Sequence, residues 1–177
     1  MKLVILDRDG VINYDSDQFI KSPEEWKPIP GSLDAIARLN HAGFTVVVAT
    51  NQSGIGRGLF EMSTLAHIHE KTQKMLMLAG GRIDAFFYCP HTADLKCSCR
   101  KPEPGMLLEI ARRFDVDLKD VPAIGDSLRD LVAAEKVGAA PILVLTGKGQ
   151  KTLENGGLPE GTKIFPDLAE AARFLAG

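Results

Sequence analysis

Residues 2–10 read Lys-Leu-Val-Ile-Leu-Asp-Arg-Asp-Gly, a short apolar run that ends in two aspartates with one residue between them. Four consecutive large aliphatic residues are typical of a strand that is buried on both faces, as in a parallel β-sheet. In open parallel sheets, ligands bind outside the carboxyl ends of the strands. The stretch therefore predicts a buried parallel strand, with Asp7 and Asp9 at the functional edge of the sheet.

The same pattern returns along the chain. Short aliphatic runs alternate with longer amphipathic stretches, which is typical of an α/β fold whose parallel sheet is covered by helices on both faces. The predicted strands span residues 2–6, 45–49, 84–88, 122–124 and 142–145. The predicted helices span residues 32–42, 63–79, 105–114, 128–137 and about 168–175. Residues 13–30 and 148–161 show no clear period and are predicted to be loops or flaps.

Length and charge restrict the possible functions. With 177 residues and 45% hydrophobic composition, residues 1–177 fit one compact domain. The formal net charge of −2 provides no basic field for nucleic acid or an anionic membrane, so a small-molecule partner is expected. No run is long enough to cross a bilayer, and the N-terminus lacks a signal-peptide pattern. We therefore expect a cytoplasmic protein. Its small size and polar flap further favour a monomer.

Polar residues follow other predicted strands as they follow the first. Thr50 comes after the second strand and Asp126 after the fourth, while Lys101 precedes a long helix. Asp7 can attack phosphorus as Asp9 serves as general acid and base, and carboxylates such as Asp126 suit Mg²⁺. Thr50 and Lys101 can stabilise the charge on phosphoryl oxygens. A lone aspartate after a strand is more often a turn former, but the coincidence of these motifs favours a phosphoryl-transfer site.

A second constellation lies in the loop of residues 89–99. Cys89, His91, Cys97 and Cys99 offer three thiolates and one imidazole, which is a complete tetrahedral zinc set. A site closed by four protein ligands has no open position, so a structural role is predicted. The alternatives are ordinary thiols beside a surface histidine, or an iron–sulfur cluster, which the histidine and the tight spacing disfavour. The clustering of all three cysteines in one loop also indicates a reducing compartment rather than a disulfide framework.

Four further residues allow weaker predictions. His67 and His69 lie on a helix of mixed polarity and are predicted to face solvent. Trp26, in the first flap, is predicted to be a packing residue. Asp130 follows Asp126 by one helical turn, so it can either orient the waters of a bound metal or cap that turn.

Four motifs together resemble the haloacid dehalogenase superfamily of phosphatases: residues 7–10, 50–52, 100–102 and 125–126, in the superfamily's order. The resemblance implies a Rossmann-like three-layer sandwich around a central parallel sheet, with no large cap domain. It also implies a small flap at about residues 10–30, catalytic Mg²⁺ and structural Zn²⁺. Nearly the whole chain takes part in this resemblance.

The resemblance carries over to individual residues. It implies that Asp7 is the nucleophile and that Asp9 is the general acid and base. It implies stabilisation of the phosphoryl group by Thr50 and Lys101. Asp7, the backbone carbonyl of Asp9 and Asp126 would bind Mg²⁺. Substrate contacts are implied in the flap, after the second strand and ahead of the third long helix, at Asp15, Ser16, Asp17, Gln18, Asn51, Gln52, Ser53 and Arg100.

Within the superfamily, the sequence is most similar to the branch that acts on heptose 1,7-bisphosphates in lipopolysaccharide-core synthesis. Arg57, in the glycine-rich run 53–58, suits the second phosphate of such a substrate, although a plain glycine turn is equally compatible. Ser127 stands where some relatives carry lysine, which removes one possible sugar or phosphate contact. Histidinol phosphate is the competing substrate, and a nucleic-acid 3′-phosphatase is disfavoured by charge. A non-catalytic, zinc-stabilised binding module is the alternative from another class.

Overall fold

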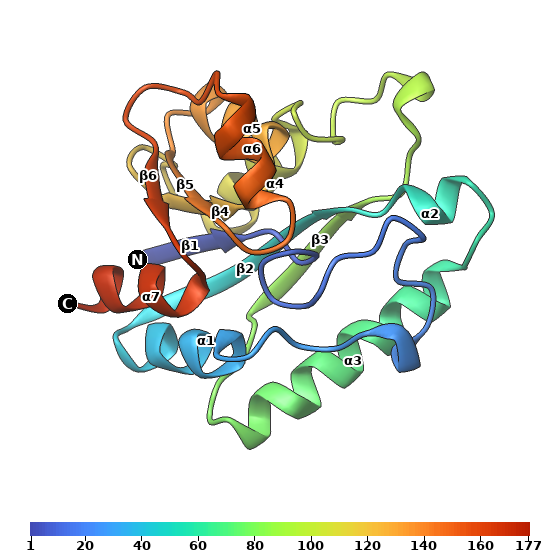
Figure 1. The fold of residues 1–177 in the computed structure, drawn as a ribbon, viewed down its shortest axis with the longest axis horizontal. Helices are drawn as coiled ribbons and strands as arrows, with labels where there is room; N and C mark the ends of the chain where they lie inside the picture. Colours follow the sequence, from blue (N-terminus) through green and yellow to red (C-terminus); the bar gives the residue numbers. More distant parts are fainter.

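The computed structural model describes residues 1–177 and contains one six-stranded sheet in the order β3-β2-β1-β4-β5-β6, with every pairing parallel (Figure 1). The strands are β1 (Lys2–Leu6), β2 (Phe44–Asn51), β3 (Ala85–Cys89), β4 (Pro122–Gly125), β5 (Ala140–Val144) and β6 (Lys163–Phe165). The α-helices are α1 (Ser32–His41), α2 (Ser53–Gly56), α3 (Met62–Leu78), α4 (Gly105–Phe114), α5 (Leu128–Lys136), α6 (Gly149–Asn155) and α7 (Leu168–Ala176). Two 3₁₀ turns complete the chain, η1 (Pro23–Glu25) and η2 (Ala93–Leu95).

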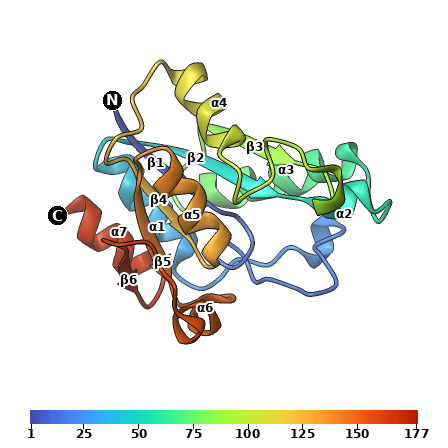
Figure 2. The same cartoon turned by 90° about the horizontal axis from the view of Figure 1, so that it is seen from above.

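Helices cover both faces of the sheet, as the second view makes clear (Figure 2). Alternate residues of a strand point to opposite faces, and β1 follows that rule. Val4 and Leu6 pack with α1, α3 and α7, whereas Leu3 and Ile5 pack with α4 and α5. The predicted three-layer α/β sandwich is therefore confirmed, and no large cap domain is inserted.

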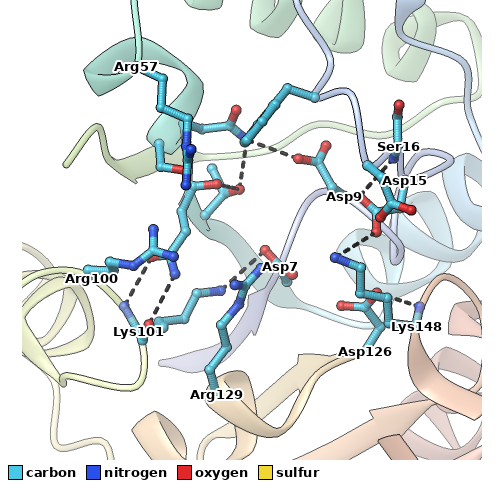
Figure 3. A pocket seen from close by; sticks show the side chains of 16 residues that line it. Asp7, Asp9, Asp15, Ser16, Arg57, Arg100, Lys101, Asp126, Arg129 and Lys148 are labelled. Carbon is cyan, nitrogen blue, oxygen red and sulfur yellow. Dashed lines mark hydrogen bonds and ion pairs between the residues drawn. The ribbon is translucent and has the colours of Figure 1, made fainter. Parts of the chain in front are cut away.

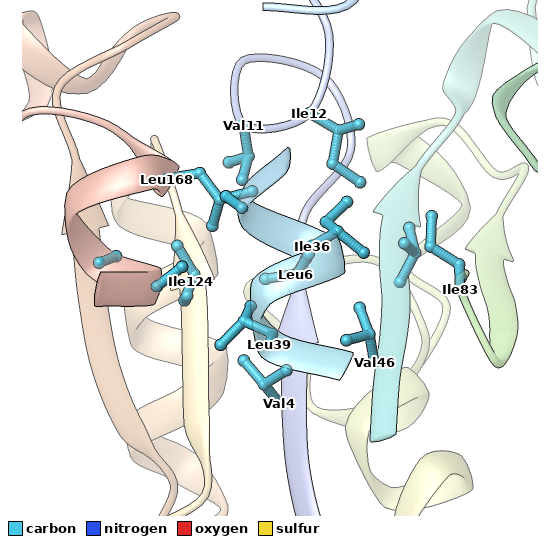
Figure 4. Close-up of a cluster of buried hydrophobic side chains, with 14 of the residues drawn as sticks. Val4, Leu6, Val11, Ile12, Ile36, Leu39, Val46, Ile83, Ile124 and Leu168 are labelled. Atoms are coloured by element: carbon cyan, nitrogen blue, oxygen red, sulfur yellow. The ribbon is translucent and has the colours of Figure 1, made fainter. Parts of the chain in front are cut away.

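The larger core cluster lies between β1 and the α1 and α7 helices (Figure 4). Three flap residues, Val11, Ile12 and Trp26, belong to this cluster and are completely buried in it. Lys71 of α3 donates hydrogen bonds to the backbone carbonyls of Pro23 and Trp26, at 2.7 and 3.0 Å. The flap is thus anchored at its base, and Trp26 is a packing residue as predicted.

Three short elements depart from the sequence prediction. The loop predicted for residues 148–161 contains α6, because Thr152 donates a hydrogen bond to the Asp126 carbonyl at 2.8 Å and holds a short helix against the sheet. The edge strand β6 was not predicted, since it has only three residues and two of them, Lys163 and Ile164, are exposed. The glycine run 53–56 forms α2 rather than a turn.

The strand order reverses direction between β1 and β4, which is the topological switch point of a doubly wound sheet. The chain leaves β1, β2 and β4 at one edge of the sheet, directly ahead of Asp7, Gln52 and Asp126. That edge is where this fold binds ligands.

Candidate active site

A polar pocket of about 210 Å³ opens at the switch point (Figure 3). Phe19 is the one hydrophobic residue among the sixteen that line it. The lining residues are Asp7, Asp9, Asp15, Ser16, Asp17, Phe19, Thr50, Asn51, Gln52, Ser53, Arg57, Arg100, Lys101, Asp126, Arg129 and Lys148. A pocket with so many charged groups and so little apolar surface suits a small, highly polar anion.

Lys101 lies at the base of this pocket between two aspartates. Its ammonium group is 3.2 Å from Asp7 Oδ1 and 2.6 Å from Asp130 Oδ1, and it donates a hydrogen bond to the Ala49 carbonyl at 2.7 Å. Burial alone would lower the pKa of Lys101, but the Asp130 and Asp7 carboxylates outweigh it and raise the pKa above its usual value. Lys101 is therefore a fixed, buried cation beside Asp7.

Asn51 fixes the backbone that carries this lysine. Its amide nitrogen donates to the Lys101 carbonyl at 3.1 Å, and its amide oxygen accepts from the Lys101 N–H at 3.0 Å. The reciprocal pair joins the end of β2 to a loop fifty residues later in the chain. The Asn51 side chain is thus committed to positioning Lys101.

Backbone segments approach Asp126 so closely that only glycine fits. A Cβ atom at Gly10 would lie 2.0 Å from Asp126 Oδ2, and one at Gly147 would lie 2.3 Å from the same oxygen. Both glycines also have positive φ angles, of +84° and +55°. The Lys148 N–H donates to this oxygen at 2.9 Å, so the β5–α6 loop holds the Asp126 carboxylate in place.

Three carboxylates meet at the pocket floor, and their charges show what the site can bind. Oxygens of Asp7, Asp126 and Asp130 lie within 4.8 Å of one another. Burial, together with the Asp130 charge, raises the pKa of Asp7 to about 7; burial and the Asp7 charge raise the pKa of Asp126 to about 8. Asp130 differs because Lys101 outweighs the effect of burial and lowers its pKa. Asp7 and Asp126 thus form an oxygen-rich set that a hard divalent cation would neutralise.

The cysteine loop gathers its predicted ligands into one cluster beside this pocket. The sulfurs of Cys89, Cys97 and Cys99 lie 2.8 to 3.6 Å apart, and His91 Nδ1 lies 3.5 Å from Cys89 Sγ and 3.3 Å from Cys99 Sγ. Tetrahedral zinc with bonds of about 2.3 Å to sulfur requires ligand separations of roughly 3.5 to 3.8 Å. Three of these separations match that range, whereas Cys99 Sγ lies closer than that to Cys89 Sγ and to His91 Nδ1 and would have to move outward around an ion. The donor set has the chemistry of a zinc site. The Arg100 guanidinium donates to the His91 carbonyl at 3.4 Å, which ties a pocket residue to this loop.

Comparison with known proteins decides the family. The profile described as polynucleotide kinase 3 phosphatase matches residues 2–130, and the HAD-hydrolase-like profile matches residues 98–171. A D-glycero-beta-D-manno-heptose-1,7-bisphosphate 7-phosphatase from Bordetella bronchiseptica is 62% identical over 175 residues, covering 99% of this chain and 98% of that protein. The chain belongs to the heptose-bisphosphate phosphatase family of the haloacid dehalogenase superfamily.

Other members of the heptose-bisphosphate phosphatase family extend the likeness. The protein of the same name from Pseudomonas putida is 57% identical, with 99% of each chain covered. A crystal structure of D,D-heptose 1,7-bisphosphate phosphatase from B. bronchiseptica, complexed with magnesium and phosphate, superposes with a TM-score of 0.98, covering 99% of this chain and 98% of that one. The enzyme from Burkholderia thailandensis is 54% identical, with a TM-score of 0.80 and complete coverage of both chains. The predicted superfamily and the phosphoric monoester hydrolase class are confirmed.

Most residues predicted for this phosphatase site come together in the pocket. Of the predicted catalytic, substrate-binding and magnesium residues, Gln18 alone lies outside it, in a neighbouring hollow on the flap. Three lining residues were missed: Phe19, Arg129 and Lys148. Arg129 lies three residues after Asp126, in the first turn of α5, so its proximity to that motif was the available signal. Lys148 lies in the segment predicted as a loop, where nothing in the sequence pattern marked it.

The prediction that His69 faces solvent is wrong. His69 is only 9% exposed, and its ring stacks on Phe86 of β3 with centroids 4.0 Å apart and an interplanar angle of 11°. Burial and the neighbouring Arg8 lower the pKa of His69 to about 3, so the ring is neutral. The α3 helix packs on the sheet at this position, and tertiary packing overrides the mixed polarity of the local sequence.

Proposed function

We propose that this phosphatase removes the 7-phosphate of D-glycero-D-manno-heptose 1,7-bisphosphate, in the ADP-heptose route to the lipopolysaccharide core. The observation that carries the proposal is full-length identity of 62% to a relative named for that reaction. The pocket is compatible with it: Arg57, Arg100 and Arg129 add cations beyond Lys101, which suits a substrate with two phosphates. Residues 1–177 would act as one catalytic domain.

Asp7 and Asp9 would share the chemistry. An Asp7 carboxylate oxygen attacks phosphorus, forming an acyl phosphate as the bond to the sugar oxygen breaks, and Asp9 in its protonated form gives that oxygen its proton. Burial raises the pKa of Asp9, but the Arg8 charge and the hydrogen bonds from Asn13, Arg8 and Gln52 outweigh it and lower that pKa, so Asp9 holds this proton weakly and gives it up readily. Asp9, now a carboxylate, takes a proton from water as the water attacks the acyl phosphate, which releases inorganic phosphate and restores Asp7. The pair lies at one edge of the sheet because β1 ends directly before it.

The groups around Asp7 would stabilise the charge on the transferring phosphoryl group. Lys101 and Thr50 both line the pocket and are both nearly fully buried, so their charge and hydroxyl dipole act in a region of low dielectric. Asp7, Asp126 and the Asp9 carbonyl would hold Mg²⁺, which supplies Lewis-acid charge at the phosphoryl oxygens when bound. Support for this ion comes from the carboxylate cluster and from the magnesium-bound relative.

Magnesium affinity should depend on pH because protons compete for the same carboxylates. The pKa of Asp7 is about 7 and that of Asp126 about 8, so both bind protons at pH 6 and release them near pH 8. We expect affinity to weaken at acid pH, by about tenfold per pH unit for each proton displaced. Calorimetric titration with MgCl₂ at pH 6 and pH 8 checks this, and equal affinities at both values would contradict it.

The same carboxylates predict how stability changes with pH. Asp7 and Asp126 have folded-state pKa values above the ordinary aspartate value, so between about pH 4 and pH 8 the folded, metal-free protein binds more protons than the unfolded chain. The stability that these groups contribute is therefore fully present below about pH 4, declines as pH rises, and is lost once pH passes the folded-state pKa values of about 7 and 8. Added Mg²⁺ should accordingly raise Tm more at pH 8 than at pH 6.

We propose that the cluster of Cys89, His91, Cys97 and Cys99 binds one structural Zn²⁺ and stiffens the loop that delivers Arg100. Cys97→Ser should lower the zinc content from about one per chain to well below that, and should lower Tm by several degrees, since metal binding contributes to folding. Metal analysis and thermal unfolding check both expectations. Ser98→Ala is the matched control in the same loop, and zinc-free wild-type protein would refute the assignment.

A substrate comparison tests the proposed reaction. We expect kcat/KM to be far higher for heptose 1,7-bisphosphate than for histidinol phosphate, because the pocket cations would otherwise face no second phosphate. The α and β anomers should be assayed separately. A preference for histidinol phosphate would replace the proposed substrate while leaving the phosphatase chemistry intact.

We also propose that the enzyme is a cytoplasmic monomer. The cysteine sulfurs lie beyond bonding distance of one another, which is compatible with a reducing compartment. No helix in the structure is both long enough and apolar enough to span a membrane. Sedimentation equilibrium at micromolar concentration would test the monomeric state.

A further inference from the structure

Arg8, between the two catalytic aspartates in sequence, is a fully buried cation. None of its surface is exposed. Its Nε and Nη2 atoms lie 2.9 and 2.8 Å from the same oxygen, Asp9 Oδ1. A buried guanidinium is costly to keep unless it is paired and hydrogen-bonded, so this contact binds the two side chains firmly together.

His69 of α3 holds the other end of the same guanidinium. Arg8 Nη1 lies 3.2 Å from His69 Nε2. Arginine can only donate hydrogen bonds, so Nε2 must be the acceptor and the ring proton must be on Nδ1. The stacking of the ring on Phe86 limits its rotation, so the histidine is a rigid support for Arg8.

The two oxygens of Asp9 consequently have different surroundings. Oδ1 is occupied by Arg8 and also accepts from Asn13 Nδ2 at 2.9 Å. Oδ2 accepts a longer hydrogen bond of 3.2 Å from Gln52, whose amide also donates to Thr50 Oγ1 at 3.0 Å. Oδ2 is therefore the oxygen left for proton exchange in the pocket.

We infer that Arg8 and His69 are positioning residues for the phosphatase reaction: they hold Oδ1 of Asp9 so that Oδ2 delivers the proton to the departing oxygen. The inference rests on the proposed chemistry, in which the bond between phosphorus and that oxygen breaks as Asp7 attacks and the Asp9 proton moves to the oxygen. Neither residue lines the pocket. Both act through the orientation of one carboxyl group.

If Arg8 and His69 orient Asp9 for proton transfer, the rate lost on replacing them should depend on the leaving group of the substrate. A sugar or glycerol oxygen must be protonated as it departs, whereas p-nitrophenolate leaves well without a proton. In rapid-quench experiments, Arg8→Met should slow acyl-phosphate formation from an alkyl phosphate on the order of tenfold more than from p-nitrophenyl phosphate, with little change in KM. A merely structural role would slow both reactions by the same factor.

His69 provides the matched pair of variants, which stay informative even if Arg8→Met fails to fold. His69→Gln retains an acceptor near the position of Nε2, whereas His69→Leu removes it. We expect the selective loss with alkyl phosphates in His69→Leu and its restoration in His69→Gln. Equal loss with both esters, or no difference between the two variants, would overturn the inference.

The wild-type enzyme separates this inference from the proposed function. If wild-type protein with Mg²⁺ hydrolyses neither ester, the proposed chemistry itself is wrong and the positioning role falls with it. If wild-type protein is active and the variants show no leaving-group dependence, the proposed function stands and the positioning role is wrong.

Discussion

Asp7→Asn is expected to lower kcat by a factor on the order of 10⁴ or more, because a neutral amide cannot form the acyl phosphate that the proposed mechanism requires. The substitution keeps the shape of the side chain at the pocket floor, where Asp7 Oδ1 lies 3.2 Å from the Lys101 ammonium. Magnesium-dependent release of phosphate from heptose 1,7-bisphosphate and from p-nitrophenyl phosphate measures the effect. Loss on both substrates is expected, since the nucleophile is common to both.

Asp17→Asn supplies the matched control for this result. It makes the same chemical change at an exposed flap residue of the same pocket, so KM should change more than kcat. Circular dichroism and thermal unfolding establish that both variants are folded. Turnover by Asp7→Asn within about tenfold of wild type would contradict the mechanism, because another group, or water itself, would then be attacking phosphorus. Asp7 would in that case have a non-catalytic role.

Lys101→Met should have the second largest effect, with kcat reduced by roughly 10² to 10³. Lys101 is the buried cation nearest to Asp7, so its loss removes charge stabilisation where the phosphoryl group is transferred. A methionine of similar length fills the space without the charge. The decrease should appear in kcat with both good and poor leaving groups, because charge on the phosphoryl oxygens develops with either.

The same variant should also be less stable, by about 3–5 kcal/mol, because it leaves Asp7 and Asp130 buried without their shared cation. The double variant Lys101→Met/Asp130→Asn removes one of the uncompensated charges and should recover part of that stability. It should not recover activity. Urea unfolding of the single and double variants at pH 8 without Mg²⁺ measures the loss of stability separately from the loss of activity. If the double variant recovered activity together with stability, Lys101 would have a structural role alone.

The fold was largely predictable because its core strands carry a strong local signal. Leu3 to Leu6 and Val46 to Val48 are aliphatic runs that only a doubly covered sheet can bury. The β6 edge strand lacks that signal, since Lys163 and Ile164 are both exposed. The α6 helix depends on a hydrogen bond from Thr152 to the Asp126 carbonyl, which is a tertiary contact that no local pattern reveals.

The site was predictable wherever a functional residue directly follows a strand. Asp7 and Asp126 were found in this way, because parallel strands bring their carboxyl ends to one edge. Arg8 and His69 could not be found, since their contact joins residues 61 positions apart and depends on how α3 packs on β3. Lys148 was missed for a similar reason: the β5–α6 loop reaches the pocket only in the folded sheet.

The most direct test of the central claim is to trap the covalent intermediate and locate it in the chain. Enzyme quenched in acid during turnover and reduced with borohydride should carry homoserine in place of the phosphorylated aspartate. Trypsin cleaves after Lys2 and Arg8, so Asp7 lies in the peptide of residues 3–8 and Asp9 in the peptide of residues 9–21. The mechanism predicts homoserine at Asp7, in the first peptide. Modification of the second peptide, or no modification in enzyme quenched during turnover, would contradict it.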